Sequence, residues 1–156
     1  MCGLIVIAHV HTIGRNYVKA TQMLKHALKI LELANEKWPK SEFPQRGASL
    51  EHTFIRKVKC TVIQYISYTV CDNSNLDVEY MKELCDQVLN CCKMRPVDLK
   101  DVEWHFWMCY HQYCIAEAHM GLAYYHKIKE IRTKHESDLS YHEYNSEHLK
   151  QAIVHY

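Results

Sequence analysis

Twelve histidines and eight cysteines are the side chains of this 156-residue chain that could bind a metal ion. Their densest group has four members: His105, Cys109, His111 and Cys114. On a helix, His105 and Cys109 share a face at one-turn spacing, as two zinc ligands can, but the other two point elsewhere. His119 and His126 share a line with His105, yet a rise of 1.5 Å per residue places His119 about 21 Å from His105. The sequence also lacks a CxxC pair, so we predict packed or solvent-facing histidines and no metal site.

A second kind of chemistry is suggested by the first three residues, Met1-Cys2-Gly3. If Met1 were removed, the Cys2 thiolate could attack an amide with its own α-amine as the base. This start resembles that of N-terminal-cysteine glutamine amidotransferases, and Arg46-Gly47 lies roughly where that family has an Arg-Gly turn. The following Ala48-Ser49 departs from the family's pattern, no Asn-Gly-Glu segment could build the oxyanion hole, and the periodicity does not indicate the family's strand-rich sandwich. A glutaminase therefore stays an alternative, while we predict no enzymatic activity, catalytic residue or cofactor.

The composition is that of one globular domain, which we expect to span residues 1–156. Apolar residues make up 48% of the chain and charged residues 24%, the balance of a soluble protein. Only four glycines and three prolines interrupt it. So few helix-breaking residues favour long helices over a β-sandwich, which needs a turn every 8–12 residues or so.

The charge and the apolar runs argue against two classes of partner. A formal net charge of +1 supplies no basic field for nucleic acid, and the apolar run at residues 4–8 is too short for a membrane span of about 20 residues. We therefore expect no membrane partner and a cytoplasmic or nuclear location. RNA binding stays a further alternative, and it would require these residues to cluster in three dimensions: Lys57, Lys59, Lys127, Lys129, Arg132 and Lys134.

Six segments have the apolar periodicity of helices. We expect them at residues 3–13, 17–37, 50–71, from the cap at Ser74 or Asn75 to the residue before Arg95, 99–134, and from Ser140 to the end of the chain. Within the third segment, residues 59–70 are rich in β-branched and aromatic side chains, which would also suit a strand. The length of that segment without a turn residue favours a helix.

The longest segment, 99–134, has two apolar stripes. One contains Val102, Phe106, Cys109, Tyr113, Ala116, Met120 and Ala123, and the other contains Trp104, Met108, Ile115, Ala118, Leu122 and Tyr125. A helix that is apolar on two faces must be packed between neighbours. We therefore predict an inner helix of a bundle or of a stacked array.

The second segment places small alanines between large residues on one stripe, which contains Tyr17, Ala20, Leu24, Ala27, Leu28, Leu31 and Trp38. Its start, GRNYVKATQMLKHAL, resembles the turn and second helix of a tetratricopeptide repeat, and AEAHMGLAYYHK is similar to a first helix. This degenerate resemblance covers about a third of the chain. It implies antiparallel helical hairpins stacked as an irregular tetratricopeptide-like α-solenoid, and the residues alone equally allow a helical bundle.

Such a resemblance implies a scaffold or adaptor for protein–protein interaction, a component of a larger complex that receives a peptide or a helix of a partner. Aromatic side chains are favoured anchors at interfaces. We expect the contact residues on the face of segment 99–134 that neither apolar stripe occupies. These candidates are Glu103, Tyr110, Glu117 and Tyr124.

Both ends of the chain carry an apolar helical pattern, beginning at Gly3 and continuing to Ile153, Val154 and Tyr156. Repeat arrays need polar outer faces on their terminal units. We therefore expect that an end packs on a partner or on a second copy of the chain, or that the sequence is a shortened part of a longer array.

Overall fold

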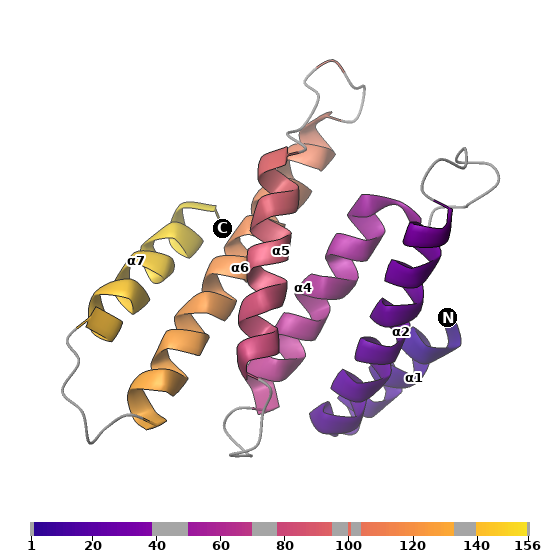
Figure 1. Ribbon diagram of the computed structural model, residues 1–156, viewed down its shortest axis with the longest axis horizontal. Coiled ribbons are helices and arrows are strands. Elements are labelled where there is room, and N and C mark those ends of the chain that lie inside the picture. The colour runs from indigo at the N-terminus through magenta and orange to yellow at the C-terminus, as the bar shows by residue number, and fades with distance from the viewer. Residues whose placement is uncertain are drawn as a thin grey trace. The chain divides into compact units, whose positions relative to one another are not determined.

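The computed structural model describes residues 2–38, 50–69, 78–94, 100, 104–132 and 140–155. These residues form six helices and no strand (Figure 1), namely α1 (Cys2–Ile13), α2 (Tyr17–Lys37), α4 (His52–Thr69), α5 (Val78–Met94), α6 (Trp104–Arg132) and α7 (Ser140–His155). The predicted all-α class is confirmed. The segment with strand-like propensity is helical in α4, because its apolar side chains are buried by packing.

The expected turn between the first two helices is present at residues 14–16. Arg15 has a positive φ of 56°, the left-handed conformation that reverses a chain at a helix end. Asn16 then caps α2, since its Oδ1 accepts a hydrogen bond from the backbone N–H of Lys19 at 3.2 Å. The cap expected at Ser74 or Asn75, and the Arg46-Gly47 pair, lie outside the described residues.

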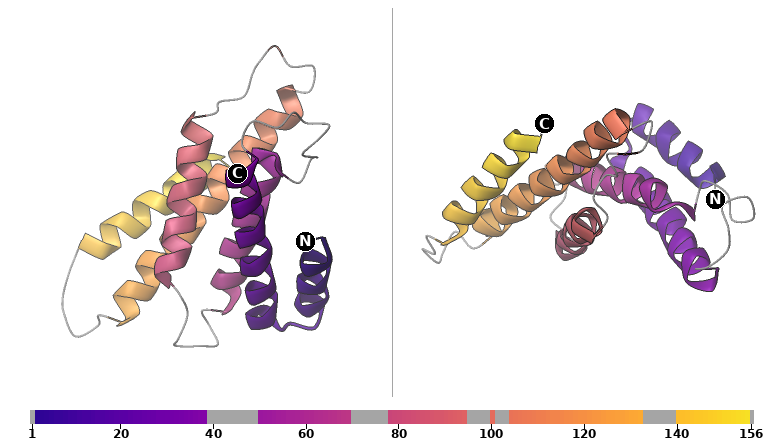
Figure 2. Two further views of the ribbon diagram at one scale, coloured as in Figure 1. Left: turned by 45° about the vertical axis from the view of Figure 1, so that its right-hand side comes forward. Right: turned by 90° about the horizontal axis from the view of Figure 1, so that it is seen from above.

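The chain divides into two compact units, residues 1–72 and 73–156. In the first unit α2 packs against α1 and α4, and in the second α6 packs against α5 and α7. The prediction that the 99–134 segment forms an inner helix is therefore confirmed for α6. Figure 2 shows α7 running alongside α6 within its unit. That all 156 residues form one domain stays a prediction.

The core of the first unit is built on the apolar stripe of α2. Ala20, Leu24, Ala27, Leu28 and Leu31 are almost completely buried. The Tyr17 ring lies 6.2 Å from the ring of Tyr65 and 5.3 Å from that of Tyr68, so it packs between α2 and α4. Trp38 does not continue the stripe as expected: it is half exposed beyond the end of α2, with the Lys37 ammonium 5.0 Å from its ring.

The core of the second unit is built on one face of α5, on which Met81, Leu84, Cys85, Val88 and Cys92 are buried. On α6 the burial begins only at Cys114. Phe106 and Cys109, expected in the core, are exposed, and the Phe106 ring instead lies 5.1 Å from that of Trp107 on the same helix.

Candidate functional site

The four residues predicted to contact a partner do not form one exposed surface. Glu103 lies outside the described residues. Tyr110 is half-buried, Glu117 is only 6% exposed, and Tyr124 is 44% exposed. The expectation that Glu117 lies on an exposed face is therefore wrong, although Tyr110 and Tyr124 keep part of their surface accessible. Contact of this face with a partner stays a prediction.

Glu117 is buried on the side of α6 that is close to α5. Burial is the main reason that the pKa of the Cys85 thiol on α5 is raised well above its usual range, and the carboxylates of Asp86 and Glu117 add to it. The carboxylate of Glu117 is thus near enough to act on a side chain of α5. Sequence periodicity could not show this, because it identifies the polar side of a helix but not the neighbour that covers it.

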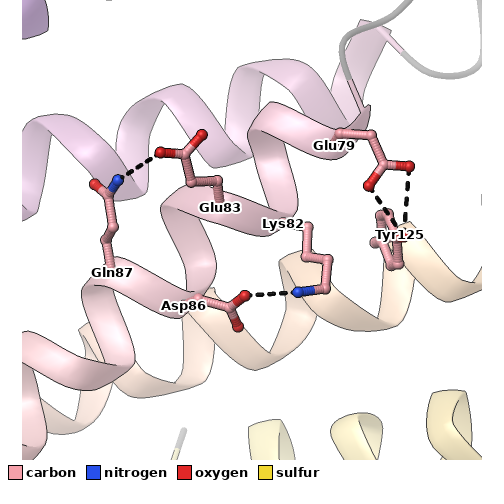
Figure 3. Close-up of polar contacts among 6 residues, drawn as sticks. All are labelled: Glu79, Lys82, Glu83, Asp86, Gln87 and Tyr125. Carbon is pink, nitrogen blue, oxygen red and sulfur yellow. Dashed lines mark hydrogen bonds and ion pairs between the residues drawn. The ribbon is translucent and has the colours of Figure 1, made fainter.

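Polar contacts hold α5 together and join it to α6 (Figure 3). Along α5, the Lys82 ammonium lies 2.7 Å from Asp86 Oδ2, and the Gln87 amide donates to Glu83 Oε1 at 3.0 Å. A separate contact reaches α6, because the Tyr125 hydroxyl donates a hydrogen bond to Glu79 of α5. The side chains of these residues form hydrogen bonds and ion pairs within the fold, and we assign them a structural role.

A row of four histidines lies where α6 packs against α7. His119 and His126 come from α6, and His148 and His155 come from α7, and the two members of each pair are seven positions apart in the sequence. The Nδ1 atoms of His119 and His148 are 3.1 Å apart. We call these four residues the histidine row. Helical spacing in the sequence placed His119 and His126 on one line. The equal spacing of His148 and His155 in α7 was the signal that could have identified the row, and the prediction did not include it.

The rings of the histidine row alternate between the two helices, and their order shows that α6 and α7 run antiparallel. The ring of His148 stacks on that of His126, with centroids 5.3 Å apart, and lies 5.4 Å from that of His119. His119 in turn stacks on His155 at 6.2 Å, and His155 Nδ1 is hydrogen-bonded to Gln112 Oε1.

The surroundings of three members of the row, His119, His126 and His148, favour neutral imidazoles. Burial is the main cause that lowers the pKa of His119, with additional contributions from His148 and His155. Burial also lowers the pKa of His126, assisted by His148 and by Lys82 of α5. For His148, burial lowers the pKa while the nearby carboxylates of Glu147 and Asp86 oppose the shift.

The described residues contain no group of three or more His, Cys, Asp or Glu side chains arranged to hold a metal ion. In the sequence cluster considered for zinc, His105 and Cys109 are exposed whereas Cys114 is completely buried. The side chains of this cluster therefore do not converge on a single metal-binding position.

Three of the lysines considered for RNA binding form ion pairs with carboxylates. Lys59 lies 2.9 Å from Glu32, Lys127 lies 3.2 Å from Glu130, and Lys129 lies 2.5 Å from Glu79. The side chains of Arg132 and Lys134 are not among those described. Each ion pair reduces the positive potential that a phosphate backbone would meet, so no observation favours the RNA-binding alternative.

Helix α1 exposes several large aliphatic side chains. Ala8 is buried, whereas Val6, Ile7, Val10 and Ile13 are exposed, Ile13 by 74%. We call these four residues the α1 apolar face. On α7, Ile153 and Val154 are similarly exposed. Across the part of the chain that the structure describes, no helix combines the length and apolar character needed to cross a membrane.

No protein-family model matches the chain. No curated protein is significantly similar to it. No solved structure is significantly similar to it either. The tetratricopeptide resemblance therefore stays a prediction, and the function must be argued from the surfaces of the fold.

Proposed function

We propose that the chain is a protein-binding adaptor that uses the α1 apolar face to hold a helix of a partner within a larger complex. The observation that supports this proposal is the exposure of four large aliphatic side chains on one short helix. Large contiguous apolar patches on soluble proteins commonly mark interaction sites, whereas scattered apolar residues do not.

The arrangement of α1 supports a docking surface on the side away from its own unit. Helix α1 packs on α2, and Ala8 is buried. Val6, Val10 and Ile13 fall within about 60° of one another around the helix axis, and Ile7 lies next to them. Burying such side chains in an interface is worth roughly 1.5–3 kcal/mol each when burial is complete.

The composition of α1 indicates the chemistry of the partner. Its twelve residues, CGLIVIAHVHTI, contain no Asp, Glu, Lys or Arg. A partner that is recognised here must therefore contribute apolar side chains at helical spacing rather than an opposite charge. An amphipathic helix of another protein fits this requirement, and a second copy of α1 would satisfy it in the same way.

The proposal is tested by affinity purification of the tagged chain, with mass spectrometry of the recovered proteins. Val6→Glu combined with Val10→Glu places two charges on the α1 apolar face, and Gln22→Glu at an exposed position of α2 is the matched control. We expect the wild type and the control to recover the same stoichiometric partner, and the double variant to lose it by at least about tenfold. Circular dichroism checks that all three remain helical.

Two outcomes would overturn the proposal. One is recovery of no stoichiometric partner by the wild type, and the other is equal recovery by the double variant. Light scattering during size-exclusion chromatography distinguishes a second copy from another protein, because self-association would double the mass of the wild type and leave the double variant monomeric.

A further inference from the structure

The histidine row occupies the contact that places α7 in its unit. Among the described helices, α7 packs against α6 alone. All four members of the row lie at this contact: their rings interleave, and His155 is bonded to Gln112 of α6. Any change in the charge of these rings therefore acts directly on the packing of α7.

The hydrogen bond between His119 and His148 requires at least one neutral ring. With the two Nδ1 atoms 3.1 Å apart, one imidazole must donate and the other must accept. When both rings are protonated, each nitrogen carries a proton and a share of positive charge, so the bond is replaced by repulsion. The stacked neighbour His126 would add like charge beside His148.

Other charged groups near the row do not cancel this repulsion. Glu147 of α7 favours protonation of His119 and His148, and Asp86 of α5 favours that of His148. Lys82 of α5 opposes protonation of His126 and is itself paired with Asp86. For His119, His126 and His148, burial remains the largest influence and favours the neutral ring.

We propose that the histidine row is a pH-sensitive latch, which keeps α7 packed on α6 while its rings are neutral and releases α7 when neighbouring rings become protonated. This inference goes beyond the proposed adaptor function and does not depend on it. Release would uncover Ala152 on α7 and the surface of α6 that it covers. The device would thus couple acidification to the exposure of new apolar surface.

The direction of the pH dependence follows from the lowered pKa values. Unfolded or released histidines titrate near 6.5, whereas the packed His119, His126 and His148 titrate below that value. The released state then binds more protons as the pH falls below about 6.5, so the latch weakens from there downward. At pH 7.5 His119, His126 and His148 are mainly neutral in both states, so protonation of these rings does not weaken the latch there.

Hydrogen exchange on the full-length chain tests the latch at pH 7.5 and pH 5.5, with protection factors corrected for the intrinsic pH dependence of exchange. We expect the protection of α7 to fall by at least about tenfold at pH 5.5 while that of α2 is unchanged. Replacing His119 and His148 by Gln, which bonds but does not titrate, should remove most of this fall. His26→Gln, at an exposed position of α2, is the matched control and should retain it.

A second measurement keeps the test decisive if the double variant does not fold. Ring resonances of the wild-type histidines can be followed by NMR from pH 8 to pH 5, and those of His119, His126 and His148 should titrate below 6.5 together with the amide signals of α7. Unchanged protection of α7 across the two pH values, or histidine titrations near 6.5 that leave the α7 amides unaffected, would overturn the latch. An equal fall in the protection of α7 in the variant with His119→Gln and His148→Gln would also overturn the latch.

Discussion

The hydroxyl of Tyr125 on α6 donates a hydrogen bond to the carboxylate of Glu79 on α5, with Oη 3.2 Å from Oε2 and 3.5 Å from Oε1 (Figure 3). Lys129, one turn further along α6, places its Nζ 2.5 Å from Glu79 Oε1 and 5.6 Å from the centre of the Tyr125 ring. The bond from Lys129, followed by its charge and the Tyr125 hydroxyl, lowers the pKa of Glu79 although burial opposes the shift. The carboxylate of Glu79, at the start of α5, thus contacts both Tyr125 and Lys129 of α6.

Replacing Tyr125 by Phe should lower the free energy of unfolding by about 0.5–1.5 kcal/mol, because the hydrogen bond is lost while the buried ring remains. The exposure of Glu79 favours the lower end of that range. Tyr124→Phe removes the same atom from an exposed neighbour and should have almost no effect. Urea unfolding at pH 7 measures both variants, and equal losses would show that the Glu79 contact contributes nothing specific.

Leu28→Ala should lower the free energy of unfolding by about 2–5 kcal/mol, because Leu28 is completely buried in the core of the first unit. Leu33→Ala makes the same chemical change on α2 at a position that is 56% exposed, and it should cost no more than about 0.5 kcal/mol. Thermal and urea unfolding provide the comparison. Similar costs at the two positions would contradict the packing described for α2.

The cysteines should react with a thiol reagent according to their burial. Cys109 is exposed, whereas Cys60, Cys85 and Cys114 are completely buried, and burial raises the pKa of the Cys85 thiol. We expect native Cys109 to be labelled at least roughly 100-fold faster than Cys85, with the difference disappearing in denaturant. Peptide mass spectrometry at pH 7.5 measures each rate. Rapid labelling of Cys85 would indicate that α5 does not stay packed on α6.

Arg15→Gly should raise the free energy of unfolding by up to about 1 kcal/mol. Arg15 has a φ of 56°, and a side chain in this left-handed region costs roughly 1–2 kcal/mol, part of which is offset by the greater freedom of glycine in the unfolded chain. Gln22→Gly is a control with the opposite expected sign. It introduces glycine into the interior of α2 and should lower the free energy of unfolding by about 1 kcal/mol. A loss of stability in Arg15→Gly would show that its side chain makes contacts worth more than the backbone strain.

Most of the secondary structure could be predicted from the sequence. The second helix was expected at residues 17–37 and is found there, because Asn16 supplies a cap and the stripe from Tyr17 to Leu31 has helical period. Residues 59–69 show the limit of local propensity: β-branched side chains suited a strand, but burial along α4 decided for a helix. The placement of α6 between two neighbours also followed from its two apolar stripes.

The candidate sites were less predictable. Helical periodicity predicts that Glu117 lies on the surface and that Phe106 lies in the core. In the structure, Glu117 is buried and Phe106 is exposed. Periodicity gives the angle of a side chain around its own helix. It does not give the stretch of that helix over which a neighbour packs, and the packing of α5 and α7 decides this for α6.

By itself, the sequence determined the helical class, the approximate extents of the helices and most of the buried stripe of α2, because these depend on local spacing of apolar residues and on capping side chains. Only the tertiary structure brought His119 and His148, which are 29 residues apart, to hydrogen-bonding distance and joined Tyr125 to Glu79. These contacts depend on the register and direction in which helices pack. The matching heptad spacings of the histidines become one row only because α6 and α7 pack side by side in a register that interleaves the rings.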